Sequence, residues 1–460
     1  MRARLPELLA VAVALAVVLL NLDAPLVDDS LFWWVPKALS VAESGPAVVL
    51  DTLPQAAAVG PTPPQWAQGL PDYAHPPLWF WYLGLWLKLP LAPHVAVHLA
   101  ALPLAIALVT GTAALLRRAG GPRAAFAAAA IPLLPPIAAQ LLRADTDLPL
   151  LALTPWALVA LMDRRSLGFA VLAALATWCK EPGVLLAAPA AGVMLLDRRL
   201  DWAWLAPLAA LGAWAGLHLA LTGAGLAGAE RLPESLGAWV RDLGQVLWLS
   251  CGAQGRILLW PGVAFALWRG ARRRPWALLA LHLGVQVLFF GTLNFLGGVE
   301  RLDAHTHVRY LLPAMLSAFA LGAAALPESS LAVGLLSLLQ LWRPHPSGPE
   351  ASLYQLDVAR ALRELPLPEE RPLWVGSYAA TQLTRPYAGL VSSPVGEVSI
   401  YGPETVPAEV VGHLVESATG EPLGRLQELE LELVEEQRVR SGWARLYRVK
   451  GMRSDVAPGR

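Results

Sequence analysis

The chain has 460 residues, and its composition excludes an ordinary soluble protein. Hydrophobic residues make up 56% of it and charged residues 15%, whereas about a quarter of a typical globular chain is charged. The 35 basic and 35 acidic residues give a formal net charge of zero. A nucleic-acid-binding surface needs a basic excess to neutralise phosphates, so no nucleic-acid partner is expected. Two cysteines, Cys179 and Cys251, are too few for a disulfide framework.

The charged residues divide the chain into two parts. Residues 1–343 carry 23 basic and 19 acidic side chains, about 12% of that part, whereas residues 344–460 carry 12 and 16, about 24%. Long stretches with few charges are typical of membrane-spanning helices. The sequence therefore predicts a membrane domain over residues 1–343 and a soluble domain over residues 344–460.

About eleven membrane-spanning helices are predicted from apolar runs bounded by charges. They lie near residues 6–22, 94–116, 122–142, 147–162, 166–179, 183–196, 202–222, 255–268, 275–297, 309–325 and 328–343. Residues 6–22 follow two arginines as a signal peptide would, but no small-residue cleavage site comes after them, so they are predicted to be an uncleaved first span.

The basic residues predict the orientation in the membrane. Arginine clusters fall on every second connection, and these connections hold 13 basic residues against 5 acidic ones. Cytoplasmic loops carry such an excess. The N-terminus is therefore predicted to be cytoplasmic and the C-terminal domain extracytoplasmic, in the plasma or inner membrane; in a Gram-negative bacterium this domain would be periplasmic.

The first outer loop, residues 23–93, begins with an acidic pair, Asp28 and Asp29. Two neighbouring carboxylates in partly dry, aromatic surroundings raise each other's pKa, which favours a base for a hydroxyl proton. The alternative is that one of them caps an interfacial helix from about residue 30 to residue 43. Because there are two acids, both interpretations can hold.

The same loop ends in His75-Pro76-Pro77, followed by an aromatic stretch. Proline is favoured in the first turn of a helix, so the diproline predicts a helix start with His75 at its amino end, where anions are attracted. The aromatic residues suit a helix at the membrane interface, and an aromatic belt with a capping histidine is the structural alternative.

Two outward-facing turns concentrate charge where the predicted helices are too short to cross. The runs at 147–162, 166–179 and 183–196 have 14 to 16 residues, which reach only about 21–24 Å across a hydrocarbon core of about 30 Å. The turns contain Arg143 and Asp147 in one case and Lys180 in the other. Irregular backbone and charged side chains at membrane depth are tolerated where they line a water-filled cavity. We therefore predict an outward-opening vestibule; longer helices with interfacial charges are the alternative.

The predicted span 309–325 begins at Arg309 and Tyr310, and two histidines, His305 and His307, precede it. A histidine pair of this spacing without a third ligand is a weak sign of metal. No nucleotide-phosphate loop or dinucleotide fingerprint is present. No cofactor is therefore expected, and a divalent metal is not indicated.

The tail predicts a small α/β domain after a proline-rich hinge. Its expected elements are a helix over 351–365, strands at 373–378 and 398–401, a helix near 406–418, and strands near 430–436 and 443–449. No residue in this part has the pattern of a catalytic group. A lid, an acceptor platform or a stabilising cap is expected.

Taken in order, these motifs resemble the GT-C glycosyltransferases. They are the first span, the acidic pair behind it, the His-Pro-Pro-Leu aromatic helix, the Thr-Asp turn, the Lys-containing turn and the late Arg-Tyr-Leu-Leu-Pro span. Within that superfamily they are most similar to the protein O-mannosyltransferase and aminoarabinose transferase branch, which is family 39-like and includes a bacterial group that adds galacturonic acid to lipopolysaccharide core. The resemblance covers roughly residues 1–343.

The resemblance implies a GT-C-like bundle of about 11 transmembrane helices with a large first extracytoplasmic loop and a small C-terminal α/β domain. It implies transfer, with inversion, of a sugar from a polyprenyl-phosphate donor to a hydroxyl of a lipid, glycan or protein acceptor. Asp28 resembles the catalytic carboxylate, and Asp29 stands where glutamate is commoner. His75, Lys180, Arg309 and Tyr310 resemble donor-phosphate residues. Asp147, Arg143 and His307 are expected to orient substrate.

Two other classes of function remain open from the sequence. Short, broken helices around buried charge are also a feature of transporters, so a transporter or flippase of lipid-linked saccharide is the alternative. Transporters usually show two matching halves, and none is visible here. An oligosaccharide polymerase or ligase of another membrane fold would be expected to carry its large outer loop late in the chain.

Overall fold

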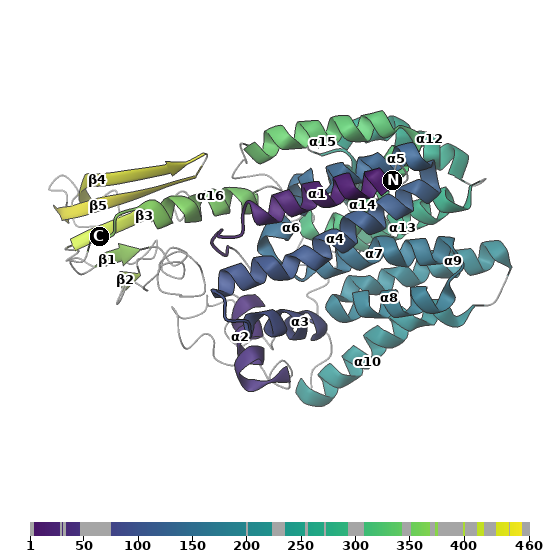
Figure 1. Cartoon of the computed structure of the whole chain (residues 1–460), viewed down its shortest axis with the longest axis horizontal. Coiled ribbons are helices and arrows are strands. Elements are labelled where there is room, and N and C mark those ends of the chain that lie inside the picture. Colours follow the sequence, from purple (N-terminus) through teal and green to yellow (C-terminus); the bar gives the residue numbers. More distant parts are fainter. Residues whose placement is uncertain are drawn as a thin grey trace.

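A computed structural model gives the fold of this chain as an elongated helical bundle with a small sheet at one end (Figure 1). The structure describes residues 4–27, 30, 34–46, 75–198, 201–222, 235–253, 256–270, 273–292, 308–342, 351–368, 373–375, 399–400, 412–417, 429–440 and 442–452. The bundle is the part that positions the candidate site.

The helices of the bundle start and end where proline, glycine and charge punctuate the sequence. The long helix α4 (Pro93–Gly120) begins with proline and ends before Gly121, whose φ of 86° suits a residue without a Cβ. It packs against α1 (Leu5–Leu19) and α7 (Asp147–Met162), and α7 packs against α8 (Ser166–Cys179). The predicted bounds of α7 and α8 are confirmed to the residue.

The remaining bundle helices also confirm predicted runs. They are α9 (Ala187–Asp197), α10 (Leu205–Thr222), α12 (Trp260–Gly270), α13 (Arg274–Thr292), α14 (Leu312–Ala325) and α15 (Pro327–Trp342). One helix was not predicted: α11 (Leu236–Cys251). It contains Arg241, Asp242 and Gln245, which interrupt the apolar run that the search for spans relied on.

The predicted span 122–142 is a broken helix rather than a straight one. The segment Pro122–Leu133, which comprises α5 (Pro122–Ala125) and η6 (Phe126–Leu133), meets α6 (Pro135–Arg143) at an angle of 61°. Pro135 and Pro136 fall at the break. Proline lacks an N–H donor and clashes with the preceding turn, so it accounts for the bend.

Among the described residues, three helices are long and apolar enough to cross a membrane by themselves, or four if the bent pair is counted as one span. Several shorter apolar helices accompany them, α1, α7 and α8 included. Large apolar side chains such as Leu167, Leu195 and Leu339 lie exposed on the bundle surface. A water-soluble protein rarely exposes so much apolar surface, which is consistent with a bundle that lies in a membrane. The number of spans, about eleven, stays a prediction.

The first outer loop forms two short helices beside α4. They are α2 (Val35–Ser44) and α3 (Leu78–Leu87), which pack against each other. The predicted helix start after the diproline is confirmed, because Pro77 is the N-cap of α3. The alternative role of the acidic pair needs a helix start at about residue 30; α2 as described begins at Val35, and because residues 28, 29 and 31–33 lie outside the described residues, this alternative stays a prediction.

The tail forms one helix and a five-stranded sheet. The helix is α16 (Ala351–Glu364), and the strands are β1 (Leu373–Val375), β2 (Ser399–Ile400), β3 (Gly412–Ser417), β4 (Leu429–Val439) and β5 (Gly442–Met452), in the order β2-β1-β3-β5-β4. β1 is parallel to β2 and β3, whereas β5 is antiparallel to β3 and β4. α16 packs on β5 and β4. The predicted helix at 351–365 and the strand positions are confirmed.

The predicted helix near 406–418 is wrong where the structure describes it, because Gly412–Ser417 is the central strand β3. Leu414 and Val415 are buried between β1 and β5. Pairing with strands on both sides overrides the local helical pattern, since strand preference depends on cross-strand packing. The rest of the expected helix lies outside the described residues.

The core of the bundle and the core of the sheet are separate. The large core runs through the bundle helices, and the smaller one lies between α16 and the sheet. In Figure 1 the sheet, α16, α2 and α3 all lie at the same end of the bundle. This end also holds the charged turns described next.

Candidate functional site

The turn between α6 and α7 carries three charged residues in five positions. Arg143 ends α6, and Ala144 ends the helix in the left-handed conformation, with φ of 48° and ψ of 48°. The backbone N–H of Thr146 donates to Asp145 Oδ1 at 2.7 Å, and Asp147 opens α7. A negative charge in the first turn of a helix is favoured by the helix dipole. The charges in this turn are buried.

The turn between α8 and η7 (Glu181–Leu186) presents Lys180 from an extended backbone position. The Lys180 N–H donates to the carbonyl of Ala176 at 3.0 Å. Gly183 lies so close to the end of α8 that a Cβ there would stand 2.5 Å from the backbone nitrogen of Thr177. A glycine is therefore required for this turn to fold back against α8 and place Lys180 and Glu181.

The third contribution comes from η12 (Val308–Leu311), directly before α14. Arg309 Nη1 donates to Asp145 Oδ2 at 2.8 Å, and Arg309 Nε lies 3.6 Å from Asp147 Oδ2. Tyr310 stacks on Phe290 of α13 with ring centroids 6.3 Å apart. The late arginine and the Thr-Asp turn, 164 positions apart in sequence, thus meet.

These segments form a buried charge cluster of three cations and two carboxylates. Arg143 Nη2 lies 3.1 Å from Asp145 Oδ2, and Lys180 Nζ lies 2.5 Å from Asp147 Oδ1. The Tyr310 ring lies 4.5 Å from Lys180 Nζ and 5.3 Å from Arg309 Cζ. None of the five charged side chains is more than 9% exposed. Away from water, charges interact more strongly and hold each other in fixed positions.

His75 joins this cluster through a residue that sequence reasoning did not select. His75 Nδ1 lies 3.0 Å from Glu181 Oε2, next in sequence to Lys180. The Trp34 ring lies 5.2 Å from the imidazole. Glu181 therefore connects the start of α3 to the turn that carries Lys180.

The structure brings six predicted site residues into one region: Arg143, Asp147, Lys180, Arg309 and Tyr310 directly, and His75 through Glu181. Asp28, Asp29 and His307 lie outside the described residues. Ser30, beside the acidic pair in sequence, is buried and donates its hydroxyl to the carbonyl of Arg143.

Two residues of the site were missed, Asp145 and Glu181. Asp145 contacts both Arg143 and Arg309, so it is central to the cluster. Both residues lie in the two turns that the short helices had marked. The short helix lengths pointed to the turns, but nothing in the sequence indicated which acidic residue of each turn belongs to the site.

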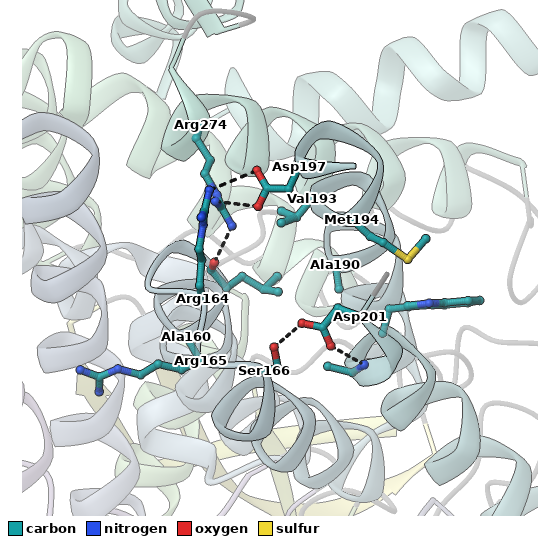
Figure 2. Close-up of a pocket in the computed structure, with 13 residues that line it drawn as sticks. Ala160, Arg164, Arg165, Ser166, Ala190, Val193, Met194, Asp197, Asp201 and Arg274 are labelled. Carbon is teal, nitrogen blue, oxygen red and sulfur yellow. Dashed lines mark hydrogen bonds and ion pairs between the residues drawn. The ribbon is translucent and has the colours of Figure 1, made fainter. Parts of the chain in front are cut away.

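A separate pocket lies at the far ends of α7 and α8 and does not belong to this cluster. It is lined by Arg164, Ser166, Asp197 and Arg274 among others (Figure 2). Arg274 Nη1 lies 2.8 Å from Asp197 Oδ2, and Arg164 Nη2 lies 3.5 Å from Asp197 Oδ1. Asp147 and Met162 are opposite ends of α7, about 22 Å apart at 1.5 Å per residue. The pocket therefore joins helix ends remote from the charge cluster.

Metal ligation has no candidate among the residues that the structure describes. No group of three or more His, Cys, Asp or Glu side chains there could hold a metal ion. The absence of a cofactor stays a prediction.

Comparison with known proteins relates this chain to one family and one fold. The family described as dolichyl-phosphate-mannose-protein mannosyltransferase matches residues 74–222. The chain also has the fold of ArnT from Cupriavidus metallidurans: the crystal structure bound to undecaprenyl phosphate gives a TM-score of 0.51 at 15% identity, covering 95% of this chain and 97% of that one. Residues 74–222 thus resemble that mannosyltransferase family, and the chain as a whole shares the fold of ArnT.

The apo structure of the same ArnT is similar at 16% identity, with a TM-score of 0.48 and coverage of 95% and 97%. No curated protein matches this chain. The part of the chain that the family match covers contains His75, Arg143, Asp145, Asp147, Lys180 and Glu181. It stops before Arg309, which only the fold brings to the cluster.

Proposed function

We propose that this protein transfers a sugar, with inversion, from a polyprenyl-phosphate donor to a hydroxyl of a lipid, glycan or protein acceptor on the outer side of the membrane. The observation that carries the proposal is the buried cluster of Arg143, Lys180 and Arg309 around two carboxylates. The matched family and the ArnT structure are both named for, or bound to, polyprenyl phosphates.

The cluster suits a phosphate leaving group. As the acceptor oxygen bonds to the anomeric carbon, the bond from that carbon to the phosphate oxygen breaks, and its electron pair leaves with the polyprenyl phosphate. Cations already fixed in a poorly hydrated site stabilise this growing negative charge more than they stabilise the ground state. Lys180 and Arg309, held over Tyr310, are the proposed donor-phosphate residues, together with His75 beside Glu181.

The acceptor hydroxyl must lose its proton as it attacks. We assign this proton to the carboxylate of Asp28, with Asp29 beside it as the second acid. Ser30 and Arg143 support the assignment, because their hydrogen bond joins the segment of the acidic pair to the charge cluster. General base catalysis of this kind contributes about 10²- to 10⁴-fold. Arg143, Asp147 and His307 are assigned to orienting the sugar and the acceptor.

We assign the domains and their orientation in the membrane on the same basis. Residues 1–343 form the transferase domain and residues 344–460 an extracytoplasmic domain, with the N-terminus in the cytoplasm. In Figure 1, α2, α3 and the sheet lie at the same end of the bundle. This supports the assignment of the first loop and the tail to the same side of the membrane. No resident cofactor is assigned, and membrane lipids surround the bundle.

The alternative of a transporter or flippase is not favoured by the site. A transported headgroup must be released on the other side, whereas the five charges here are paired with one another and buried at one end of the bundle. Their arrangement fits stabilisation of charge at one place.

The proposal is tested with purified chain in lipid nanodiscs, a panel of polyprenyl-phosphate sugars and hydroxyl acceptors. Released polyprenyl phosphate and glycosylated product are measured together by mass spectrometry. The wild type should form both in equal amounts, and Asp28→Asn should lose at least about 10²-fold in rate because the base is gone. Lys450→Ala, an exposed cation on β5, should keep the wild-type rate.

Two outcomes would contradict the proposal. An Asp28→Asn protein that transfers sugar at the wild-type rate removes Asp28 as the base. A wild type that releases no polyprenyl phosphate with any donor, yet moves intact lipid-linked saccharide across vesicles, is a flippase.

A further inference from the structure

A short segment between α1 and the acidic pair lies between the two cores of the protein. We call residues 21–27 the strap. Ala24 and Val27 are buried in the core shared with α16 and the sheet, whereas Leu26 is buried in the core of the bundle. The strap therefore contributes side chains to both cores, and moving it would disturb both.

Two arginines of α16 hold the strap from the side of the tail. Arg360 Nη2 donates to Asn21 Oδ1 at 2.6 Å. Arg363 Nη1 donates to the carbonyl oxygen of Asp23 at 2.7 Å and lies 3.1 Å from its carboxylate Oδ2. Both arginines project from one face of α16, because they are three positions apart. They bind backbone as well as side chain, which fixes the path of the strap.

Two histidines of α4 hold the strap from the side of the bundle. His94 Nε2 lies 3.2 Å from Asp23 Oδ1, and His98 Nε2 donates to the carbonyl oxygen of Ala24 at 2.9 Å. The hydrogen bond with His94, supported by the charge of Arg363, holds the pKa of the Asp23 carboxyl below its usual value. Asp23 is therefore ionised, and its contacts are intact, at neutral pH.

The strap leads directly into the site. Val27 and Ser30 are the described residues on either side of the acidic pair, and both are buried. Ser30 donates to the carbonyl of Arg143. Leu142, next to Arg143, packs against the core of α16 and the sheet. The tail thus touches both segments that carry predicted site residues: the one before Asp28 and the one before Asp145.

We propose that Arg360 and Arg363 of α16 are positioning residues for sugar transfer. They hold the strap against α4 directly before Asp28 in the sequence, and the tail domain is thereby a part of the active-site scaffold rather than a detachable cap. The inference rests on the proposed function for the role of Asp28. The contacts of the strap are independent of that role.

The expected effect is on turnover rather than on donor binding. Arg363→Ala and Arg360→Ala should each lower kcat by about 10- to 100-fold, because a displacement of about 1 Å of a reacting group costs this much. The KM for the donor should change less than about threefold, since Lys180 and Arg309 are untouched. Arg363→Lys should recover part of kcat, because one Nη atom makes both contacts to Asp23 and an ammonium can replace it.

A second measurement tests the strap without any assay of transfer. Amide hydrogen exchange over residues 21–34 should rise in Arg360→Ala and Arg363→Ala, while exchange in α7 and α8 stays as in the wild type. Arg438→Ala is the matched control: Arg438 lies in the same domain and pairs with a glutamate on β4, but is 67% exposed and has no contact with the strap among those described. It should leave exchange and kcat unchanged.

The outcomes separate this inference from the proposed function. If the wild type does not transfer sugar, the proposed function fails, while faster exchange in the arginine variants still supports the strap contacts. Unchanged exchange in both variants would overturn those contacts. Faster exchange with wild-type kcat, or a lowered Tm with wild-type kcat per folded molecule, would overturn the positioning role.

Discussion

At the scale of the residue, the acidic and basic side chains of the charge cluster neutralise one another. Lys180 and Asp147 are both buried, and each carries a charge that would be costly alone. Arg309 contacts both carboxylates, so it links the two halves of the cluster. The ion pairs fix the positions of the buried cations before a substrate binds, so the site is rigid in advance of the reaction.

Lys180 should therefore separate stability from catalysis. Lys180→Met leaves Asp147 with Arg309 as its remaining ion-pair partner among the described residues and should lower the free energy of unfolding by about 3 kcal/mol, with a rate loss of about 10²- to 10³-fold from the missing cation. Adding Asp147→Asn removes the unpaired charge and should restore most of the stability but not the rate. Thermal unfolding and donor titrations on both variants check this, with Lys450→Met as the control.

Two other results would contradict the role assigned to Lys180. If Lys180→Met impaired use of the acceptor and left the KM for the donor unchanged, Lys180 would not be a donor-phosphate residue. If the double variant recovered transfer, the cation would be structural only.

At the scale of the element, two irregular turns position the site. The α6–α7 turn depends on the left-handed Ala144, and the α8–η7 turn depends on Gly183. Prolines fix the neighbouring starts: Pro135 and Pro136 begin α6, and Pro182 begins η7. The charged residues of the candidate site therefore lie in turns rather than on helix faces. The conformation of these turns depends on proline, glycine and one strained alanine.

Gly183→Ala should displace the turn that carries Lys180. The new methyl group would stand 2.5 Å from the backbone nitrogen of Thr177, which cannot move without shifting α8. We expect a loss of about 1–3 kcal/mol in stability and at least about a tenfold loss in transfer. Gly212→Ala in α10 is the control, because nothing lies within 4 Å of its Cβ position.

A Gly183→Ala protein with the rate and Tm of the Gly212→Ala control would show that the turn does not need its close approach to α8. Measurement of both quantities on both proteins decides this.

At the scale of the whole molecule, the candidate site lies at one end of the bundle. The sheet, α16, α2 and α3 share an end of the bundle (Figure 1), and the pocket of Arg164 and Asp197 lies at the far ends of α7 and α8 (Figure 2). Arginines concentrate near that far pocket, as expected of a cytoplasmic face.

Single cysteines should report this orientation in intact cells. Both native cysteines are buried, which keeps background labelling low. A membrane-impermeant maleimide added outside should label Arg438→Cys but not Arg165→Cys, which should react only after the membrane is opened; these positions are 67% and 75% exposed. The reverse pattern would invert the proposed topology, and labelling of both from outside would place both ends on one side.

Local features were predictable to different extents. α7, α8 and the start of α3 were predicted closely, because charge and proline mark their ends within a few residues. α11 was missed because its polar residues hid it, and β3 was mistaken for a helix because its strand character comes from its neighbours β1 and β5. Six of the predicted site residues lie together in space, whereas their roles remain proposals.

The sequence by itself determined the class of the protein, the positions of most helices and the turns that hold its charges. These follow from apolar runs, prolines and charge placement, all of which act over a few residues. Only the tertiary structure decided which charges meet. Asp145 pairs with Arg309 across 164 positions, and Asp23 pairs with Arg363 across 340. Such pairing depends on shared burial between distant segments, which no local pattern encodes.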